Sequence, residues 1–161
     1  MEDMDRALVL GAVLKRIGNY DMSTFEGRLV LQKTVYLLQA HGLYIGYKFS
    51  WYVHGPYCPE LTKEAFKLSP MYKRIPHANF AEPQTEKRFE RFLGFLGNEK
   101  DNADWLEQLA CTHLLKALNP RAKKSKIINT VLDHEPHFTK RQCEQAWDYL
   151  VENGLIKEKE E

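Results

Sequence analysis

Six basic side chains in the last third of the chain have the charge and spacing to contact nucleic-acid phosphates. They are Arg121, Lys123, Lys124, Lys126, Lys140 and Arg141. Only Asp133 and Glu135 oppose them between residues 121 and 143. Because lysine and arginine bind phosphate backbones electrostatically, this stretch predicts a DNA-binding surface. The alternative is an ordinary solvated helix face, since the net charge of the whole chain is only +1.

Aromatic residues around a Gly-Pro turn offer a second kind of surface. Period-two alternation places Phe49 and Trp51 on one face of a strand, which we expect to be buried. Tyr52, His54 and Tyr57 flank the turn and are expected at the surface. Exposed aromatic side chains are frequent anchors for protein partners, so these three predict a partner-binding edge.

The spacing of the residues gives little support for a metal-binding site or a catalytic site. The nearest groupings of metal-ligating types are His54 with Cys58, Cys111 with His113, and His134 and His137 with Cys143. None has the paired spacing of a zinc site, and no phosphate loop, nucleophile elbow or Cys-x-x-Cys is present. We therefore predict a non-enzymatic protein without a metal or cofactor. The alternative is a small enzyme with an unfamiliar site, which a deep polar pocket around His54 would indicate.

Helical periodicity and turn residues predict the elements that carry these groups in the first half. Apolar spacing predicts helices over residues 3–17 and from a capping box at Ser23 and Glu26 to about residue 41. A strand is expected over 47–54, and proline at the first helical position predicts a helix over 59–68. Residues 69–84 form the longest expected loop.

The second half predicts four helices. The first spans residues 85–96, the next begins at Asp101 or Asn102, and the third spans 123–134. Thr139 and Gln142 form a capping box for the last helix, which Gly154 ends, and Leu155-Ile156 would begin a wing strand. This order is typical of a winged helix-turn-helix.

The predicted fold class is mainly α, of the α+β type. It has a helical lobe with a short β-sheet over residues 1–84 and a winged-helix-like lobe over 85–161.

The segment LQKTVYLLQAHGLYIGYKFSWYVHGPYCPEL over residues 31–61 resembles the YwgA-like family of small proteins and, more distantly, the Panacea domain of SocA-type antitoxins. The matching features are Leu31-Gln32-Lys33, Tyr36, Tyr52, His54-Gly55-Pro56 and Glu60-Leu61. The resemblance implies a mainly helical fold with no established catalytic residue. Panacea domains bind and neutralise a partner toxin, so the resemblance implies an antitoxin-like, protein-binding alternative.

A polar helix edge could contact the turn of this motif. Gln32, Lys33 and Tyr36 lie within one turn of a predicted helix, so they could hydrogen-bond to the His54-Gly55-Pro56 turn and lock the helix to the strand. The same residues are our candidates, together with Tyr52, His54 and Tyr57, for a partner-binding site.

Composition limits the class of protein. The 161-residue chain has 43% hydrophobic residues, three widely spaced cysteines, no long apolar run and an acidic start, so we expect a cytoplasmic protein without a signal peptide or membrane span. Its candidate partners are DNA and a protein such as a toxin, and no oligomeric state follows from the sequence. The leading hypothesis is a regulator that binds nucleic acid through the winged-helix-like lobe.

Overall fold

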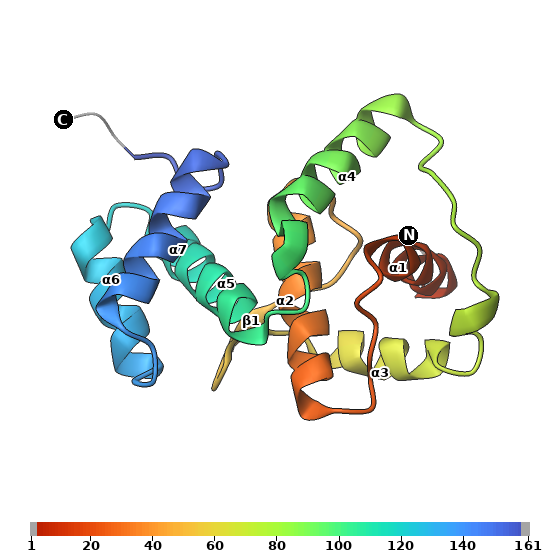
Figure 1. The fold of residues 1–161 in the computed structure, drawn as a ribbon, viewed down its shortest axis with the longest axis horizontal. Helices are drawn as coiled ribbons and strands as arrows, with labels where there is room; N and C mark the ends of the chain where they lie inside the picture. Colours follow the sequence, from red (N-terminus) through yellow and green to blue (C-terminus); the bar gives the residue numbers. More distant parts are fainter. Residues whose placement is uncertain (1–2, 159–161) are drawn as a thin grey trace.

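The computed structural model describes residues 3–158, and within this range the protein is mainly helical, as predicted (Figure 1). Seven α-helices are present: α1 (Asp3–Ile17), α2 (Phe25–Ala40), α3 (Pro59–Leu68), α4 (Pro83–Leu96), α5 (Ala103–Leu118), α6 (Lys124–His134) and α7 (Lys140–Glu152). One antiparallel hairpin joins β1 (Ser50–Tyr52) to β2 (Gly55–Tyr57). None of the described helices is long and apolar enough to cross a bilayer.

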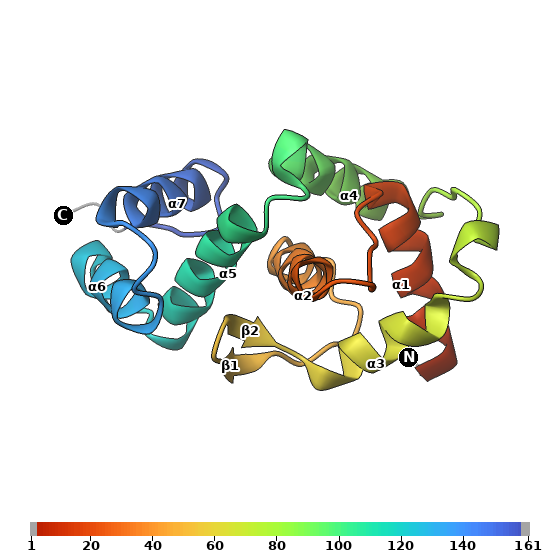
Figure 2. The same cartoon turned by 60° about the horizontal axis from the view of Figure 1, so that its bottom comes forward.

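Helix α2 is the centre of the fold. Its side chains from Val30 to Leu38 are all buried, including those of polar residues. Figure 2 shows α1, α4, α5 and the hairpin arranged around it. A helix covered on every side cannot have a polar face toward water, so its polar side chains must find partners inside the protein.

The hairpin differs from the predicted strand over residues 47–54. The strand β1 is shorter, and the Gly-Pro segment expected to be a turn forms β2, with Tyr52 opposite Gly55. The reason lies in Gln39, whose Nε2 donates to the Tyr47 carbonyl oxygen at 2.8 Å while its Oε1 accepts from the Tyr47 amide at 3.1 Å. The side-chain amide therefore takes the backbone groups that a longer strand would need.

Capping explains where two helices begin. The cap of α2 is Thr24, which accepts from the Gly27 amide at 2.9 Å, so the predicted Ser23 cap is wrong by one residue. The Ser23 hydroxyl donates instead to Asp21. At α7 the predicted capping box is confirmed, because Thr139 and Gln142 exchange both side-chain-to-backbone hydrogen bonds.

The last three helices pack together, with α5 between the hairpin and the α6–α7 pair (Figure 2). The predicted wing strand is wrong for the described residues. The amides of Leu155 and Ile156 both donate to the Leu150 carbonyl oxygen, and Ile156 is buried. The chain after α7 therefore folds back on its own helix rather than forming a strand.

One hydrophobic core runs from α1 to α7. Helix α4 contacts both halves: Phe95 packs on the ring of His41, the cap after α2, and its carbonyl oxygen accepts from the Tyr149 hydroxyl of α7 at 2.6 Å. The boundary predicted between residues 84 and 85 falls in the first turn of this helix.

Candidate functional site

Two polar residues of α2 hold β2 and the residue after it in place, and Lys33 makes the contact with the Gly-Pro segment that the sequence predicts. Gln32 forms a two-way pair with Cys58, accepting from its amide and donating to its carbonyl oxygen, both at 2.8 Å. Lys33 donates from Nζ to the Pro56 carbonyl oxygen at 2.6 Å. Both side chains are fully buried, so these hydrogen bonds fix the helix against the Gly-Pro strand.

Four side chains meet beneath the hairpin turn, and we call them the His–Glu cluster: His54, Glu107, Glu135 and His137. His54 Nδ1 lies 3.4 Å from Glu107 Oε1. His137 reaches both carboxylates, with Nε2 3.8 Å from Glu107 Oε2 and Nδ1 3.6 Å from Glu135 Oε2. One ligand atom from each of His54, Glu107 and Glu135 lies within 4.8 Å of the others.

The two carboxylates of the cluster are buried without full hydrogen bonding. Glu107 is 4% exposed and Glu135 is 3% exposed, and the Oε1 atom of each accepts no hydrogen bond. Burial, together with the charge of Glu135, raises the pKa of Glu107 to about 7. Burial also raises the pKa of Glu135, against the opposing charges of His137 and His54. Two buried carboxyl groups with unsatisfied oxygens are costly unless something compensates them.

Lys33 and Cys111 line the inner side of the cluster. Burial lowers the pKa of Lys33, while the negative groups around it, Glu107 and Glu135 among them, act in the opposite direction. Burial raises the pKa of the Cys111 thiol above its ordinary value, which keeps the sulfur neutral at physiological pH. Lys33 is thus the buried basic side chain that interacts electrostatically with the two carboxyl groups.

Gly55 brings the turn close enough to α5 to form the cluster. Its φ of +87° favours glycine, and a Cβ at this position would overlap the sulfur of Cys111. The carbonyl oxygen of His54 lies 3.9 Å from that same sulfur. A residue with a side chain would push the turn, and His54 with it, away from Glu107.

Tyr36, the third predicted residue on the polar edge of α2, does not reach the turn. Its hydroxyl lies 2.6 Å from Nδ1 of His113 on α5. Burial raises the pKa of Tyr36 and lowers the pKa of His113 to about 4. The pair therefore links α2 to α5 in its neutral form.

Large apolar side chains surround the outer face of the turn. Val53 is 81% exposed, Phe25 is 58% exposed and Tyr52 is 47% exposed. The Phe25 ring packs edge-on against His54, and the Tyr52 ring against Tyr57. We call Phe25, Tyr52 and Val53 the hairpin surface. Phe49 and Trp51, expected to be buried, are partly buried against the core.

The structure divides the six predicted phosphate-binding residues into two groups. Arg121, Lys123, Lys124 and Lys126 lie around the start of α6, whereas Lys140 and Arg141 lie at the start of α7. Lys124 forms an ion pair with Asp148 of α7 at 3.2 Å, and Lys140 lies 4.0 Å from Glu144. Four of the six keep exposed side chains without an ion pair among the described residues: Arg121, Lys123, Lys126 and Arg141.

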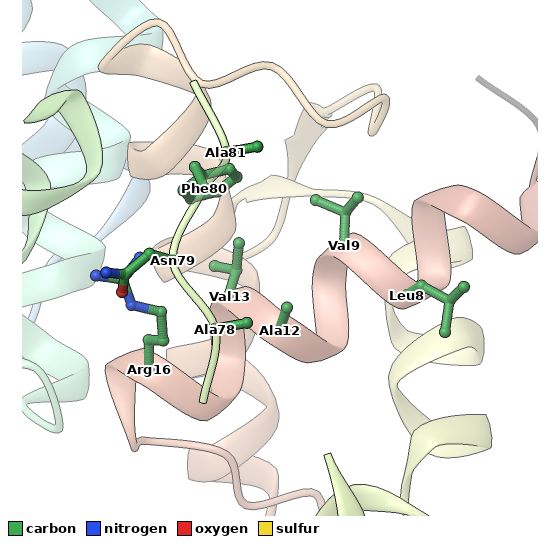
Figure 3. Close-up of a pocket in the computed structure, with 9 residues that line it drawn as sticks. All are labelled: Leu8, Val9, Ala12, Val13, Arg16, Ala78, Asn79, Phe80 and Ala81. Atoms are coloured by element: carbon green, nitrogen blue, oxygen red, sulfur yellow. The ribbon is translucent and has the colours of Figure 1, made fainter. Parts of the chain in front are cut away.

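Two open recesses lie away from the His–Glu cluster. One has a volume of about 300 Å³ and is mostly apolar, between α1 and residues 78–81 (Figure 3). In that view Leu8 and Val9 point outward from α1, and Phe80 lies across from them. The other, of about 600 Å³, lies between α4 and the end of α7 and contains Arg88 and Arg91. Neither contains a residue of the predicted sites.

Sequence reasoning missed Glu107 and Glu135. Glu107 lies between Leu106 and Gln108 on the buried side of α5, and Glu135 is the cap at the end of α6. A glutamate on the buried side of an amphipathic helix is the signal that could have identified Glu107. Comparison with known proteins adds nothing to the site, since no family model, curated protein or solved structure matches the chain.

Proposed function

We propose that this protein binds a partner protein through the hairpin surface of Phe25, Tyr52 and Val53. The observation that carries the proposal is the exposure of these three large apolar side chains around one turn. Contiguous exposed apolar side chains typically mark sites of protein interaction. The hydrogen bonds of Lys33 and Gln32 fix Pro56 and Cys58 against α2, so the strand that follows the turn is already in place for binding.

The two-stranded sheet is suited to bind an extended segment of the partner protein. Strand β1 has a strand partner on one side only within the described residues, and its burial pattern leaves Ser50 and Tyr52 exposed. An edge strand can pair with an extended chain through backbone hydrogen bonds, while neighbouring apolar side chains select its residues. The proposed partner therefore presents a short extended segment with an apolar side chain that packs on Tyr52.

Substitution at Val53 tests this proposal. Because Val53 is largely exposed, Val53→Asp should leave the free energy of unfolding within about 0.5 kcal/mol and abolish retention of the native partner by the purified protein. Leu118→Asp is the matched control, since Leu118 is 61% exposed and lies at the end of α5. A partner that is lost with Val53→Asp and kept with Leu118→Asp supports the proposal. Equal retention by both variants contradicts it.

Nucleic-acid binding is the second candidate function. It is supported by the α6–turn–α7 arrangement, in which both helices begin with exposed basic side chains. In a helix-turn-helix, the first helix contacts the DNA backbone and the second enters the major groove. The division of the basic residues into two groups, and the ion pairs of Lys124 and Lys140, make this the weaker of the two candidates.

A salt series with duplex DNA tests the second function. If the exposed basic residues contact phosphates, log K should fall linearly with log salt, and Arg141→Gln should reduce the slope by about 1. Lys73→Gln, on a distant exposed basic residue, should leave the slope unchanged. A DNA affinity that does not change with salt concentration would contradict nucleic-acid binding through these basic residues.

A further inference from the structure

We propose that His54, Glu107 and Glu135 bind a divalent metal ion of the zinc type. This site lies beneath the hairpin turn and is independent of the outer surface proposed for a partner. It joins residues from three separate parts of the fold: the hairpin turn, the middle of α5 and the end of α6.

The separations of the ligand atoms fit a small divalent ion. Zinc binds imidazole nitrogen and carboxylate oxygen at roughly 2.0–2.2 Å, which places neighbouring ligand atoms of a tetrahedron about 3.4 Å apart. His54 Nδ1 and Glu107 Oε1 are 3.4 Å apart, and an atom of Glu135 completes a group within 4.8 Å. The longest separation in the group, at most 4.8 Å, would have to shorten by up to about 1.4 Å to reach the tetrahedral spacing.

Buried carboxylate oxygens without hydrogen bonds from the described residues favour a cation as their partner. The Oε1 atoms of Glu107 and Glu135 are buried and accept no hydrogen bond, although His54 Nδ1 lies close to the first of them. Lys33 is the buried basic side chain near them, and its Nζ donates to the Pro56 carbonyl oxygen. When both carboxylates are ionised, one Lys33 charge leaves the group net negative, and a divalent ion would compensate it.

The donor set selects the class of ion. Calcium and magnesium prefer all-oxygen coordination, whereas an imidazole with two carboxylates suits zinc, cobalt, iron or manganese. Three protein ligands leave one position of a tetrahedron open, as in zinc sites that hold a water molecule or a substrate.

His137 and Cys111 complete the surroundings of the site. The ring nitrogens of His137 lie 3.8 Å from Glu107 Oε2 and 3.6 Å from Glu135 Oε2, and its side chain is 53% exposed, so it borders the site on a solvent-exposed side. The Cys111 sulfur lies near the His54 carbonyl oxygen and outside the ligand set. The proposal therefore predicts coordination by nitrogen and oxygen without sulfur.

Calorimetric titration of the chelator-treated full chain with zinc chloride tests the site. The wild-type protein should bind one Zn²⁺ per chain with a Kd at or below about 10 µM. Glu107→Gln and Glu135→Gln should each weaken binding at least tenfold, because glutamine keeps the shape of the side chain but removes the charge. Matched controls on exposed residues, His77→Ala and Glu152→Gln, should bind as the wild type does.

Cobalt substitution reports the ligands directly. Co²⁺ should give visible d–d bands that disappear in His54→Ala, without the near-ultraviolet band of a cobalt–thiolate bond. Thermal unfolding of each variant in chelator verifies that it folds. The proposal is overturned if folded Glu107→Gln and Glu135→Gln bind Zn²⁺ as tightly as the wild type, if a thiolate band appears, or if no binding is detected. In the last case the cluster is a histidine–carboxylate ion-pair group only.

Discussion

The buried imidazole of His113 makes the stability of the protein depend on pH. Its Nδ1 lies 2.6 Å from the Tyr36 hydroxyl, and burial lowers its pKa to about 4, whereas histidine in an unfolded chain titrates near 6.5. The unfolded state therefore takes up a proton at a higher pH than the folded state does. The contribution of neutral His113 to the free energy of unfolding is fully present above pH 6.5 and is lost as the pH falls toward 4.

Replacing His113 with asparagine should remove this dependence. The free energy of unfolding of the wild type should fall, relative to His113→Asn, by up to about 3 kcal/mol between pH 7 and pH 4. Urea unfolding of both proteins at several pH values measures the difference, in which contributions from other titrating groups cancel. A difference that stays constant across this range would contradict the burial of a neutral His113.

At the residue scale, sequence reasoning predicted contacts that come from one segment and missed those that do not. Gln32 and Lys33 were predicted to meet the His54-Gly55-Pro56 turn, and the hydrogen bond to the Pro56 carbonyl oxygen confirms this for Lys33. Gln32 bonds instead to Cys58, two residues beyond Pro56. Glu107 and Glu135 are distant from His54 in the sequence. Only the packing of α5 against the hairpin, and of α6 against α5, brings them together.

At the scale of elements, the hairpin is the part that the whole site depends on. Lys33 holds it from α2, and the missing side chain of Gly55 lets it approach α5. Local signals such as the Thr139 capping box could be predicted, because the residues that form them are close in sequence. The length of β1 could not, because it depends on the side-chain amide of Gln39 from another element.

Gly55→Ala should destabilise the protein by about 2 kcal/mol or more. The alanine would be strained at a φ of +87°, and its methyl group would overlap the Cys111 sulfur. Chemical denaturation of the single variant and of Gly55→Ala with Cys111→Ala separates the two causes. In the double variant, only the part of the stability loss that comes from the overlap with the Cys111 sulfur should be recovered, and the part that comes from backbone strain should remain. A loss below about 0.5 kcal/mol in the single variant would show that the turn does not need this close approach.

At the scale of the whole molecule, α5 packs against the inner side of the hairpin, whose outer side carries exposed apolar residues. Its Glu107 lies beneath the hairpin turn, while Phe25, Tyr52 and Val53 cover the outside of the same turn. The mainly helical class followed from periodicity and turn residues, which are local. The missing wing and the separation of the basic residues depend on how α7 packs, which periodicity does not specify.

The most direct test of the account is the thermal unfolding midpoint with Zn²⁺ and with chelator, for the wild type and Glu107→Gln. At a free Zn²⁺ concentration about 100 times the Kd, the wild-type midpoint should rise by about 5–10 °C. Glu107→Gln loses a buried carboxylate, so it should fold at least as stably in chelator, and its at least tenfold weaker binding should give at most about half of the wild-type rise at the same Zn²⁺ concentration. An equal rise in both proteins, or no rise in the wild type, would contradict a metal site built on the buried carboxylates.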